Sequence, residues 1–101
     1  MSNDQNQTGD LVKERVAPKN EEPKVYKVVL MNDDYSTMEF VVQVLETVFQ
    51  KSPAESFRLM MHVHTQGSAV AGIYGWEVAE TKVETVTKMA KSAGFPLRAL
   101  T

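Results

Sequence analysis

The run Asn32-Asp33-Asp34-Tyr35 places an amide and two carboxylates side by side. Asn and Asp favour turns because their side chains accept hydrogen bonds from nearby backbone amides, so a turn alone accounts for part of this pattern. Two adjacent carboxylates nevertheless repel each other, a cost that a simple turn does not require. So many oxygen acceptors in so short a run indicate a site for a cation.

Both histidines of the chain lie further along, in the run Met60-Met61-His62-Val63-His64. Residues three and four apart share a face of an α-helix, so a helix here would group Met60, Val63 and His64 and turn His62 elsewhere. Histidines two apart do not form the four-apart pair that binds zinc in zinc-protease helices. A histidine beside an apolar stripe is more often a boundary residue than a ligand.

Methionine is unusually frequent, with six in the chain. Four of them, Met31, Met38, Met60 and Met61, lie close in sequence to the polar residues described above. Methionine commonly fills gaps in a core, but it also suits a pocket that accepts several apolar shapes. Both interpretations stay open from the sequence pattern alone.

Length and composition limit the classes of protein. A chain of 101 residues is sufficient for one small domain. A net charge of −2 and a pI near 5.6 argue against a nucleic-acid partner. The absence of cysteine excludes disulfides and thiolate sites. No signal peptide or membrane-spanning stretch is evident, so we expect a soluble, cytoplasmic protein that does not associate with membranes, and nothing indicates more than a monomer.

Residues 1–24 are a polar mixture that cannot bury enough apolar area to offset the entropy of ordering. We therefore expect a flexible N-terminal extension over 1–24 and a single folded domain over 25–101. The domain begins with a run of β-branched and aromatic residues over 25–31, which predicts a strand ending at the polar turn.

Two helix-start signals follow this strand. Ser36 and Ser52 each precede a glutamate by three residues, which is typical of a capping box, and Pro53 suits the first helical position. The predicted helices end near residues 50 and 64, with Gly67 suited to a left-handed exit. The apolar face of the first helix comprises Val41, Val44, Leu45 and Val48.

The last part of the chain predicts two strands and a helix. Residues 68–75 alternate, with Ala69, Ala71 and Ile73 on one side, as a half-buried strand does. Helical spacing then runs from Ala79 to Ala93, with Gly94 after it, and 97–100 forms a short final strand. The order βααβαβ predicts an α+β fold, in which a small three-stranded antiparallel sheet is covered by three helices.

Three sequence blocks carry a resemblance to a known family. YKVVLMNDDYSTMEF (26–40), MMHVHTQG (60–67) and EVAETKV (77–83) resemble the signature blocks of the ClpS adaptor family, in the family's order and spacing. The resemblance implies a non-enzymatic adaptor without a cofactor or a metal. Such an adaptor binds substrate proteins bearing an N-terminal Leu, Phe, Tyr or Trp and delivers them to the N-domain of the AAA+ unfoldase ClpA of the ClpAP protease.

The resemblance also implies roles for individual residues. The substrate's α-amino group would be bound by Asn32, Asp34 and His64, with Asp33 contributing charge beside them. The pocket for the first side chain would comprise Leu30, Met31, Ser36, Met38, Val41, Met60, Val63 and Leu97. Within it, Met38 matches the gate residue that disfavours β-branched first residues.

Two further features are implied by the same resemblance. Glu77 and Lys82 match the unfoldase-facing surface, and residues 1–24 match the extension that engages the unfoldase during delivery. The family usually reads Thr-Pro-Met-Glu where this chain has Ser36-Thr37-Met38-Glu39, so the rigid proline before the gate residue is missing.

Two other classes of function compete with the adaptor. A metal-dependent hydrolase could use Asp33, Asp34, His62 and His64, but the two histidines diverge and no acidic general base is spaced for a metal-bound water. A structural interaction module like the C-terminal domain of the ribosomal stalk protein would share the helix-on-sheet architecture, although a shared fold does not carry function.

Overall fold

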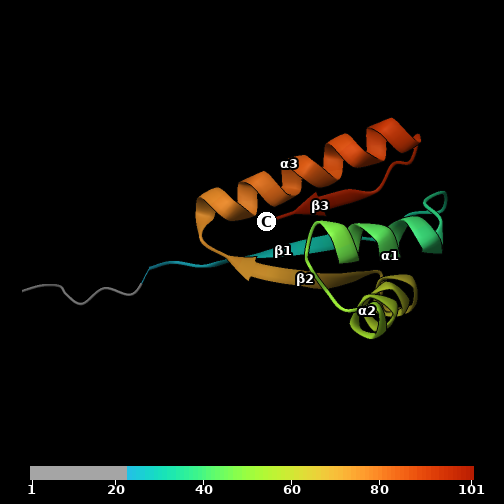
Figure 1. Ribbon diagram of the computed structural model, residues 1–101, viewed down its shortest axis with the longest axis horizontal. Helices are drawn as coiled ribbons and strands as arrows, with labels where there is room; N and C mark the ends of the chain where they lie inside the picture. The colour runs from blue at the N-terminus through green and yellow to red at the C-terminus, as the bar shows by residue number, and fades with distance from the viewer. Residues whose placement is uncertain (1–22) are drawn as a thin grey trace, which may run out of the picture.

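A computed structural model describes residues 23–101 of the chain (Figure 1). Its elements are β1 (Tyr26–Met31), α1 (Met38–Thr47), α2 (Pro53–Gln66), β2 (Ser68–Tyr74), α3 (Trp76–Ala93) and β3 (Arg98–Leu100). The predicted α+β class and the order βααβαβ are confirmed. The flexible extension predicted for 1–24 falls almost wholly outside the described residues.

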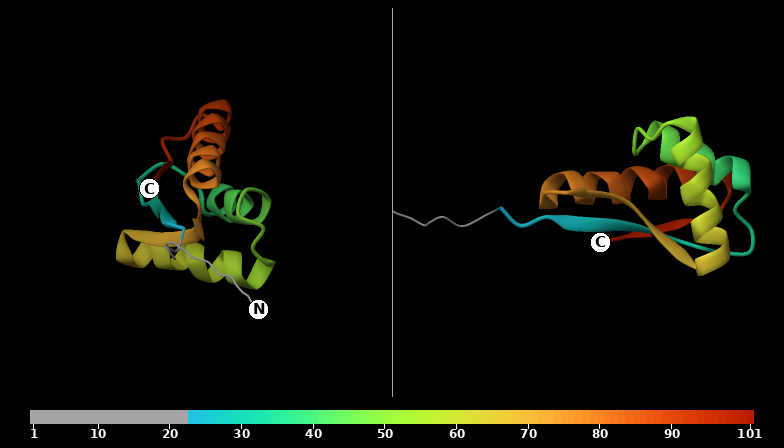
Figure 2. Two further views of the ribbon diagram at one scale, coloured as in Figure 1. Left: turned by 90° about the vertical axis from the view of Figure 1, so that its left-hand side faces the viewer. Right: turned by 90° about the horizontal axis from the view of Figure 1, so that it is seen from below.

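The three strands form one antiparallel sheet in the order β2-β1-β3, and the helices lie on one side of it (Figure 2). Side chains alternate between the faces of a strand, so Val28 and Leu30 of β1 point toward the helices and are fully buried. On the other face Val29 pairs with Val70 on one side and with Leu100 on the other. The central strand thus anchors the core and ends beside the polar turn.

The helices supply the rest of the core. The predicted face of α1 is confirmed, because Val41, Val44, Leu45 and Val48 are all buried. Ala79, Val86 and Ala90 form the buried face of α3, while Ala93, at its last position, is exposed. Burial of large apolar side chains contributes about 1.5–3 kcal/mol each, so this core is the main force holding α1 against β1.

The predicted alternation of β2 is correct at Ala69 and Ala71, which are buried, and wrong at Ile73, which is 56% exposed. The register explains the difference. Val28 pairs with Gly72 and Val29 pairs with Val70, so Ala71 is an extra residue in β2. A bulge of this kind shifts the side-chain phase by one, which turns Ile73 outward.

The predicted N-cap of α1 is wrong by one residue. Thr37, not Ser36, is the cap, and its hydroxyl accepts a hydrogen bond from the Phe40 amide at 3.1 Å. The Ser36 amide instead donates to the Asp33 carboxylate, which keeps Ser36 within the preceding turn. The Ser36 hydroxyl is buried without a hydrogen-bond partner.

The connection between α1 and α2 also differs from the expectation. The helix α1 ends at Thr47 rather than near Gln50, because Gln50 adopts a left-handed conformation with φ of 52°. Lys82 of α3 holds this connection, since its ammonium donates to the Val48 carbonyl at 2.5 Å and to Gln50 Oε1 at 3.1 Å.

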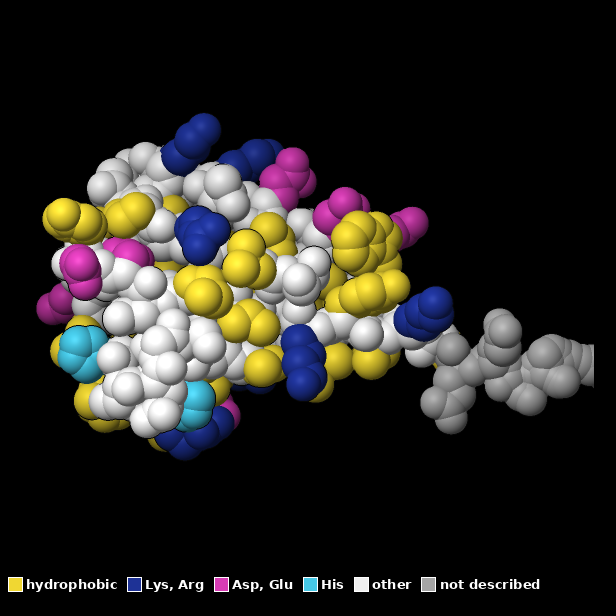
Figure 3. Space-filling model, turned by 180° about the vertical axis from the view of Figure 1, so that it is seen from behind, with side chains coloured by type: hydrophobic (Ala, Val, Ile, Leu, Met, Phe, Trp, Pro, Cys, Tyr) yellow, Lys and Arg dark blue, Asp and Glu magenta, His cyan; other side chains and the backbone are white. Residues whose placement is uncertain are grey.

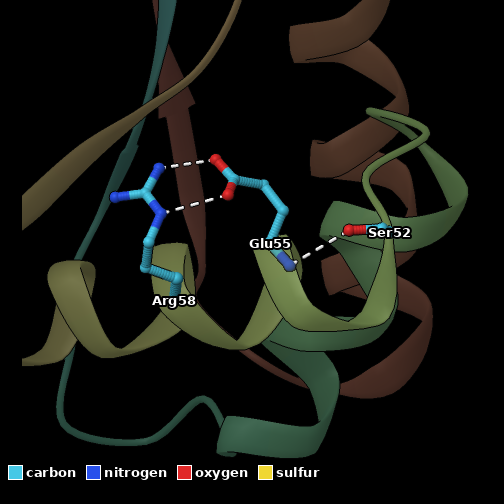
Figure 4. Close-up of polar contacts among 3 residues, drawn as sticks. All are labelled: Ser52, Glu55 and Arg58. Atoms are coloured by element: carbon cyan, nitrogen blue, oxygen red, sulfur yellow. Dashed lines mark hydrogen bonds and ion pairs between the residues drawn. The ribbon is translucent and has the colours of Figure 1, made fainter.

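The start of α2 follows the sequence prediction. Ser52 accepts a hydrogen bond from the Glu55 amide at 3.2 Å, and Pro53 occupies the first helical position. Arg58 then donates to both carboxylate oxygens of Glu55, as Figure 4 shows. The helix runs to Gln66, beyond the expected end near residue 64, and Gly67 closes it with φ of 93°. This extra half turn places His64 within the helix.

The position of the α1 cap predicts different effects for two neighbouring substitutions. Thr37→Ala removes an N-cap and should lower the free energy of unfolding by about 1 kcal/mol in urea denaturation. Ser36→Ala removes a hydroxyl without a partner and should change it by less than about 0.5 kcal/mol. A larger loss for Ser36→Ala than for Thr37→Ala would restore Ser36 as the cap.

Candidate functional site

The site forms where the end of β1 meets the end of α2. The Asn32 amide donates a hydrogen bond to the Gly67 carbonyl at 2.9 Å, directly beside the strand pair of Met31 with Ser68. The polar turn after β1 is thereby joined to the end of the helix that carries His64. Two segments far apart in sequence meet through this contact.

Asp33 builds the turn. Its Oδ1 atom accepts hydrogen bonds from the amides of Tyr35, at 2.8 Å, and Ser36, at 2.7 Å. Partial burial alone would raise the pKa of this carboxyl, but the Ser36 and Tyr35 amides outweigh it, and the pKa lies below its ordinary value of 3.8. The Ser36 hydroxyl adds to this lowering by proximity, although its geometry does not meet that of a hydrogen bond.

Asn32, Asp34 and His64 present exposed side chains around this turn. No hydrogen bond joins their side chains to any other residue within 23–101. An Asn amide oxygen, a carboxylate and a neutral imidazole nitrogen are all acceptors, so together they can surround a group with several N–H donors. Figure 3 shows both histidines, in cyan, at the same end of the molecule as a group of acidic side chains.

A cavity of about 240 Å³ opens among these residues. Sites for drug-sized ligands are commonly about 300–1,000 Å³, so this volume suits a single side chain better than a larger molecule. The lining residues are Asn32, Asp33, Asp34, Ser36, Met38, Val41, Met60, Val63 and His64. All nine belong to the set expected from the sequence.

Three residues expected in the pocket do not line this cavity. Leu30 is fully buried, because its position on β1 points toward the helices, and Leu97 is only 4% exposed within the core. Met31, the next residue of β1, points to the opposite face of the sheet from Leu30. The two-residue period of the strand and the core packing account for the absence of these three side chains from the cavity lining.

The cavity walls differ in how firmly they are held. Val41, Met60 and Val63 are buried, at 6%, 4% and 3% exposure. Met38, at the first position of α1, is 49% exposed. One flexible thioether at the rim and a packed interior make a cavity that admits apolar side chains of more than one shape.

The metal-hydrolase alternative gains no support from the geometry. His62 Nδ1 lies 2.9 Å from the Ser68 carbonyl oxygen, so this ring nitrogen contacts the backbone. Within residues 23–101, no group of three or more His, Cys, Asp and Glu side chains is arranged to hold a metal ion.

A second cavity, of about 430 Å³, lies between the end of α1 and the start of α3. Glu77 and Lys82 both line it. Glu77 is exposed, whereas Lys82 is partly buried, with its ammonium 5.5 Å from the Tyr74 ring centre and bonded to the α1 terminus. Lys82 therefore shapes this surface from within, and Glu77 provides its exposed charge.

Comparison with known proteins gives the class. The model of the family described as "ATP-dependent Clp protease adaptor protein ClpS" matches residues 21–100. A ClpS protein of Desulfatibacillum aliphaticivorans is 56% identical over 90 residues, covering 89% of this chain and 86% of the relative. A ClpS protein of Wolinella succinogenes is 54% identical over 79 residues, covering 78% of each chain.

A solved structure agrees with these relatives. Agrobacterium tumefaciens ClpS2 bound to L-phenylalaninamide is similar to this chain with a TM-score of 0.75 and 47% identity, over 78% of this chain and 95% of that one. The protein is therefore an adaptor of the Clp protease rather than an enzyme. It belongs to the ClpS family. Within residues 23–101, no helix is long and apolar enough to span a bilayer.

The lowered pKa of Asp33 predicts a pH-dependent contribution to stability. A carboxyl whose pKa falls on folding stabilises the folded protein at pH values above its ordinary pKa of 3.8. This contribution is lost as the pH falls through the folded-state pKa. Asp33→Asn should therefore lower the free energy of unfolding by about 1 kcal/mol at pH 7. Urea denaturation should show this difference shrinking as the pH falls below 3.8 and through the lowered folded-state pKa.

Asp34→Asn is the matched control, because it makes the same change one residue away, at an exposed side chain. It should alter the free energy of unfolding by less than about 0.5 kcal/mol at pH 7. A penalty for Asp33→Asn that is equally large at pH 7 and pH 3 would contradict the assigned role of the Asp33 charge.

Proposed function

We propose that this adaptor binds substrate proteins by an N-terminal Leu, Phe, Tyr or Trp and delivers them to a ClpA-type AAA+ unfoldase of the Clp protease. The observation that carries the proposal is the cavity in which Asn32, Asp34 and His64 lie beside Met38 and Met60. Polar acceptors and an apolar space adjoin there, as the first residue of a polypeptide requires.

The chemistry of a chain terminus fits the polar residues. A protein N-terminus is an ammonium with an ordinary pKa of about 7.7–8.0, so at neutral pH it is mostly charged and carries three donors. Asn32, Asp34 and His64 offer one acceptor group each, and Asp33 adds negative charge nearby. A lysine ammonium within a sequence would bring the same charge, but not an adjoining side chain to fill the apolar space.

The bound molecule of the solved relative supports the same assignment. L-phenylalaninamide, to which the Agrobacterium ClpS2 is bound, has a free α-amino group, an aromatic side chain and an amide in place of a peptide bond. Chemically it represents the first residue of a polypeptide that begins with Phe. With 47% identity between the chains, we transfer this mode of binding to the cavity of the present protein.

The expected affinity suits an adaptor that must release its cargo. Charge-assisted hydrogen bonds contribute about 1.5–3 kcal/mol each, and burial of one large apolar side chain contributes about 1.5–3 kcal/mol more. After the costs of association, a dissociation constant in the micromolar range is expected, corresponding to about −8 kcal/mol.

Delivery requires a second surface. We assign contact with the N-domain of the unfoldase to the cavity of about 430 Å³ around Glu77, shaped by Lys82. We assign engagement of the unfoldase during delivery to the extension 1–24, which precedes the single domain 25–101. Substrate binding and unfoldase contact then use different parts of the adaptor, so both can occur at once.

Peptides that differ only at their first residue test substrate binding. Fluorescence anisotropy should give micromolar dissociation constants for peptides beginning with Phe and at least tenfold weaker binding for the same peptide beginning with Ala. N-terminal acetylation removes the ammonium charge and should weaken the Phe peptide at least tenfold. Asp34→Ala should weaken it about tenfold or more. Equal binding of the free and acetylated peptides would refute the proposal.

Glu77→Arg tests delivery separately from binding. In a reaction with ClpA, ClpP and ATP, this reversal should slow degradation of a Phe-initiated reporter several-fold, because it reverses the exposed charge of the proposed unfoldase surface. The dissociation constant for the Phe peptide should stay within twofold of wild type. Glu84→Arg, an exposed reversal on the same helix α3, is the control and should leave both quantities unchanged. Degradation that is unaffected by Glu77→Arg would remove Glu77 from the unfoldase surface.

A further inference from the structure

His62 makes a hydrogen bond that crosses the end of its own helix. Its Nδ1 atom lies 2.9 Å from the carbonyl oxygen of Ser68, six residues later and beyond the last residue of α2. A carbonyl oxygen only accepts, so Nδ1 must carry the hydrogen, which fixes the tautomer of a neutral His62 ring. Within residues 23–101, this is the only side-chain hydrogen bond that crosses the turn from α2 to β2.

The turn that it crosses is the one that joins the two halves of the site. Gly67, with φ of 93°, donates its amide to the Val63 carbonyl at 2.9 Å and accepts from the Asn32 amide at the same distance. Its neighbour Ser68 is the residue whose carbonyl His62 binds. Two successive carbonyls therefore accept hydrogen bonds: the Gly67 carbonyl from the Asn32 amide, and the Ser68 carbonyl from the His62 ring of α2.

This arrangement bears directly on the distance between the acceptors of the site. His64 and Val63 belong to the last turn of α2, and helix ends fray unless they are held. The bond from Thr65 to the Met61 carbonyl lies within the helix and holds nothing beyond it. The His62 bond instead spans the last turn of α2 and joins the helix to the first residue of β2, which pairs with Met31 next to Asn32.

We infer that His62 is a positioning residue, whose imidazole holds the α2–β2 turn and thereby sets the separation of Asn32 and His64. The inference rests on the proposed function, because it assigns to His62 the spacing of acceptors for the substrate's ammonium. His62 itself does not line the cavity. Binding sites require their groups to be held within about 0.5 Å, so loosening this turn should weaken the ligand without unfolding the protein.

The test compares two substitutions at His62. His62→Ala removes the donor and should weaken a Phe-initiated peptide about three- to tenfold in fluorescence anisotropy. His62→Gln keeps an N–H donor on a flexible side chain that can reach the same carbonyl, and should stay within about twofold of wild type. Arg58→Ala is the control, because it removes the contact of the exposed Arg58 side chain with Glu55 in the N-terminal half of α2, and it should also stay within twofold.

Hydrogen exchange at the Asn32 amide gives a second readout that a general loss of stability would not reproduce. Measured by NMR without peptide, exchange of this amide should accelerate several-fold in His62→Ala but not in His62→Gln or Arg58→Ala, since the Asn32 amide is bonded to the turn that His62 holds. Amides in the middle of α3 should exchange at the wild-type rate in all three variants.

The outcomes separate the two proposals. If the wild-type protein binds the free and the acetylated Phe peptides equally, the proposed function is refuted. The exchange measurement then still decides whether His62 holds the turn. Unchanged Asn32 exchange in His62→Ala overturns the inference even where binding falls. Unchanged binding in His62→Ala overturns it as well, as does a His62→Gln protein that binds as weakly as His62→Ala.

Discussion

The site depends on one backbone hydrogen bond, from the Asn32 amide to the Gly67 carbonyl. A single bond of this kind contributes only about 0.5–1.5 kcal/mol net. It is effective because it continues the strand pairing, which already brings Met31 to Ser68 and β1 to β2. Turns and helix ends are commonly less stable than the core, and here the sheet holds the polar turn and the end of α2 in place relative to each other. The acceptors on either side are therefore positioned by the core without taking part in it.

The adjacent carboxylates of Asp33 and Asp34 have different structural surroundings. Asp33 points inward, where two backbone amides compensate its charge and lower its pKa, so its ionised form supports the turn. Asp34 points outward and is exposed beside Asn32. The repulsion that makes the pair costly in isolation is reduced because the two side chains face different surroundings. One carboxylate builds the loop, which leaves the other available to a ligand.

Local patterns in the sequence predicted what depends on local geometry. The cap at Ser52, the left-handed Gly67 and the nine cavity residues follow from spacing and from the family resemblance. The capping pattern alone could not choose the cap of α1, since Ser36 and Thr37 both have hydroxyls and the hydrogen bond from the Ser36 amide to Asp33 decides between them. Nor could the bulge at Ala71, which exists only in the register of β2 against β1. That Leu30, Met31 and Leu97 do not line the cavity could not be predicted either, because position along a chain does not give the direction of a side chain.

Thr37 stands directly before Met38, at the position where the resemblance to the ClpS family implies a proline. Its φ of −75° is close to the value near −65° that a proline ring imposes, so the backbone here has the conformation that proline would give. Proline fixes that conformation by its ring but has no side-chain acceptor, whereas Thr37 fixes it by a hydrogen bond from the Phe40 amide. Met38 is the first residue after this cap and forms the exposed rim of the cavity. The rigidity of this rim is therefore coupled to the stability of the start of α1, and through Phe40 to the core in which that ring is buried.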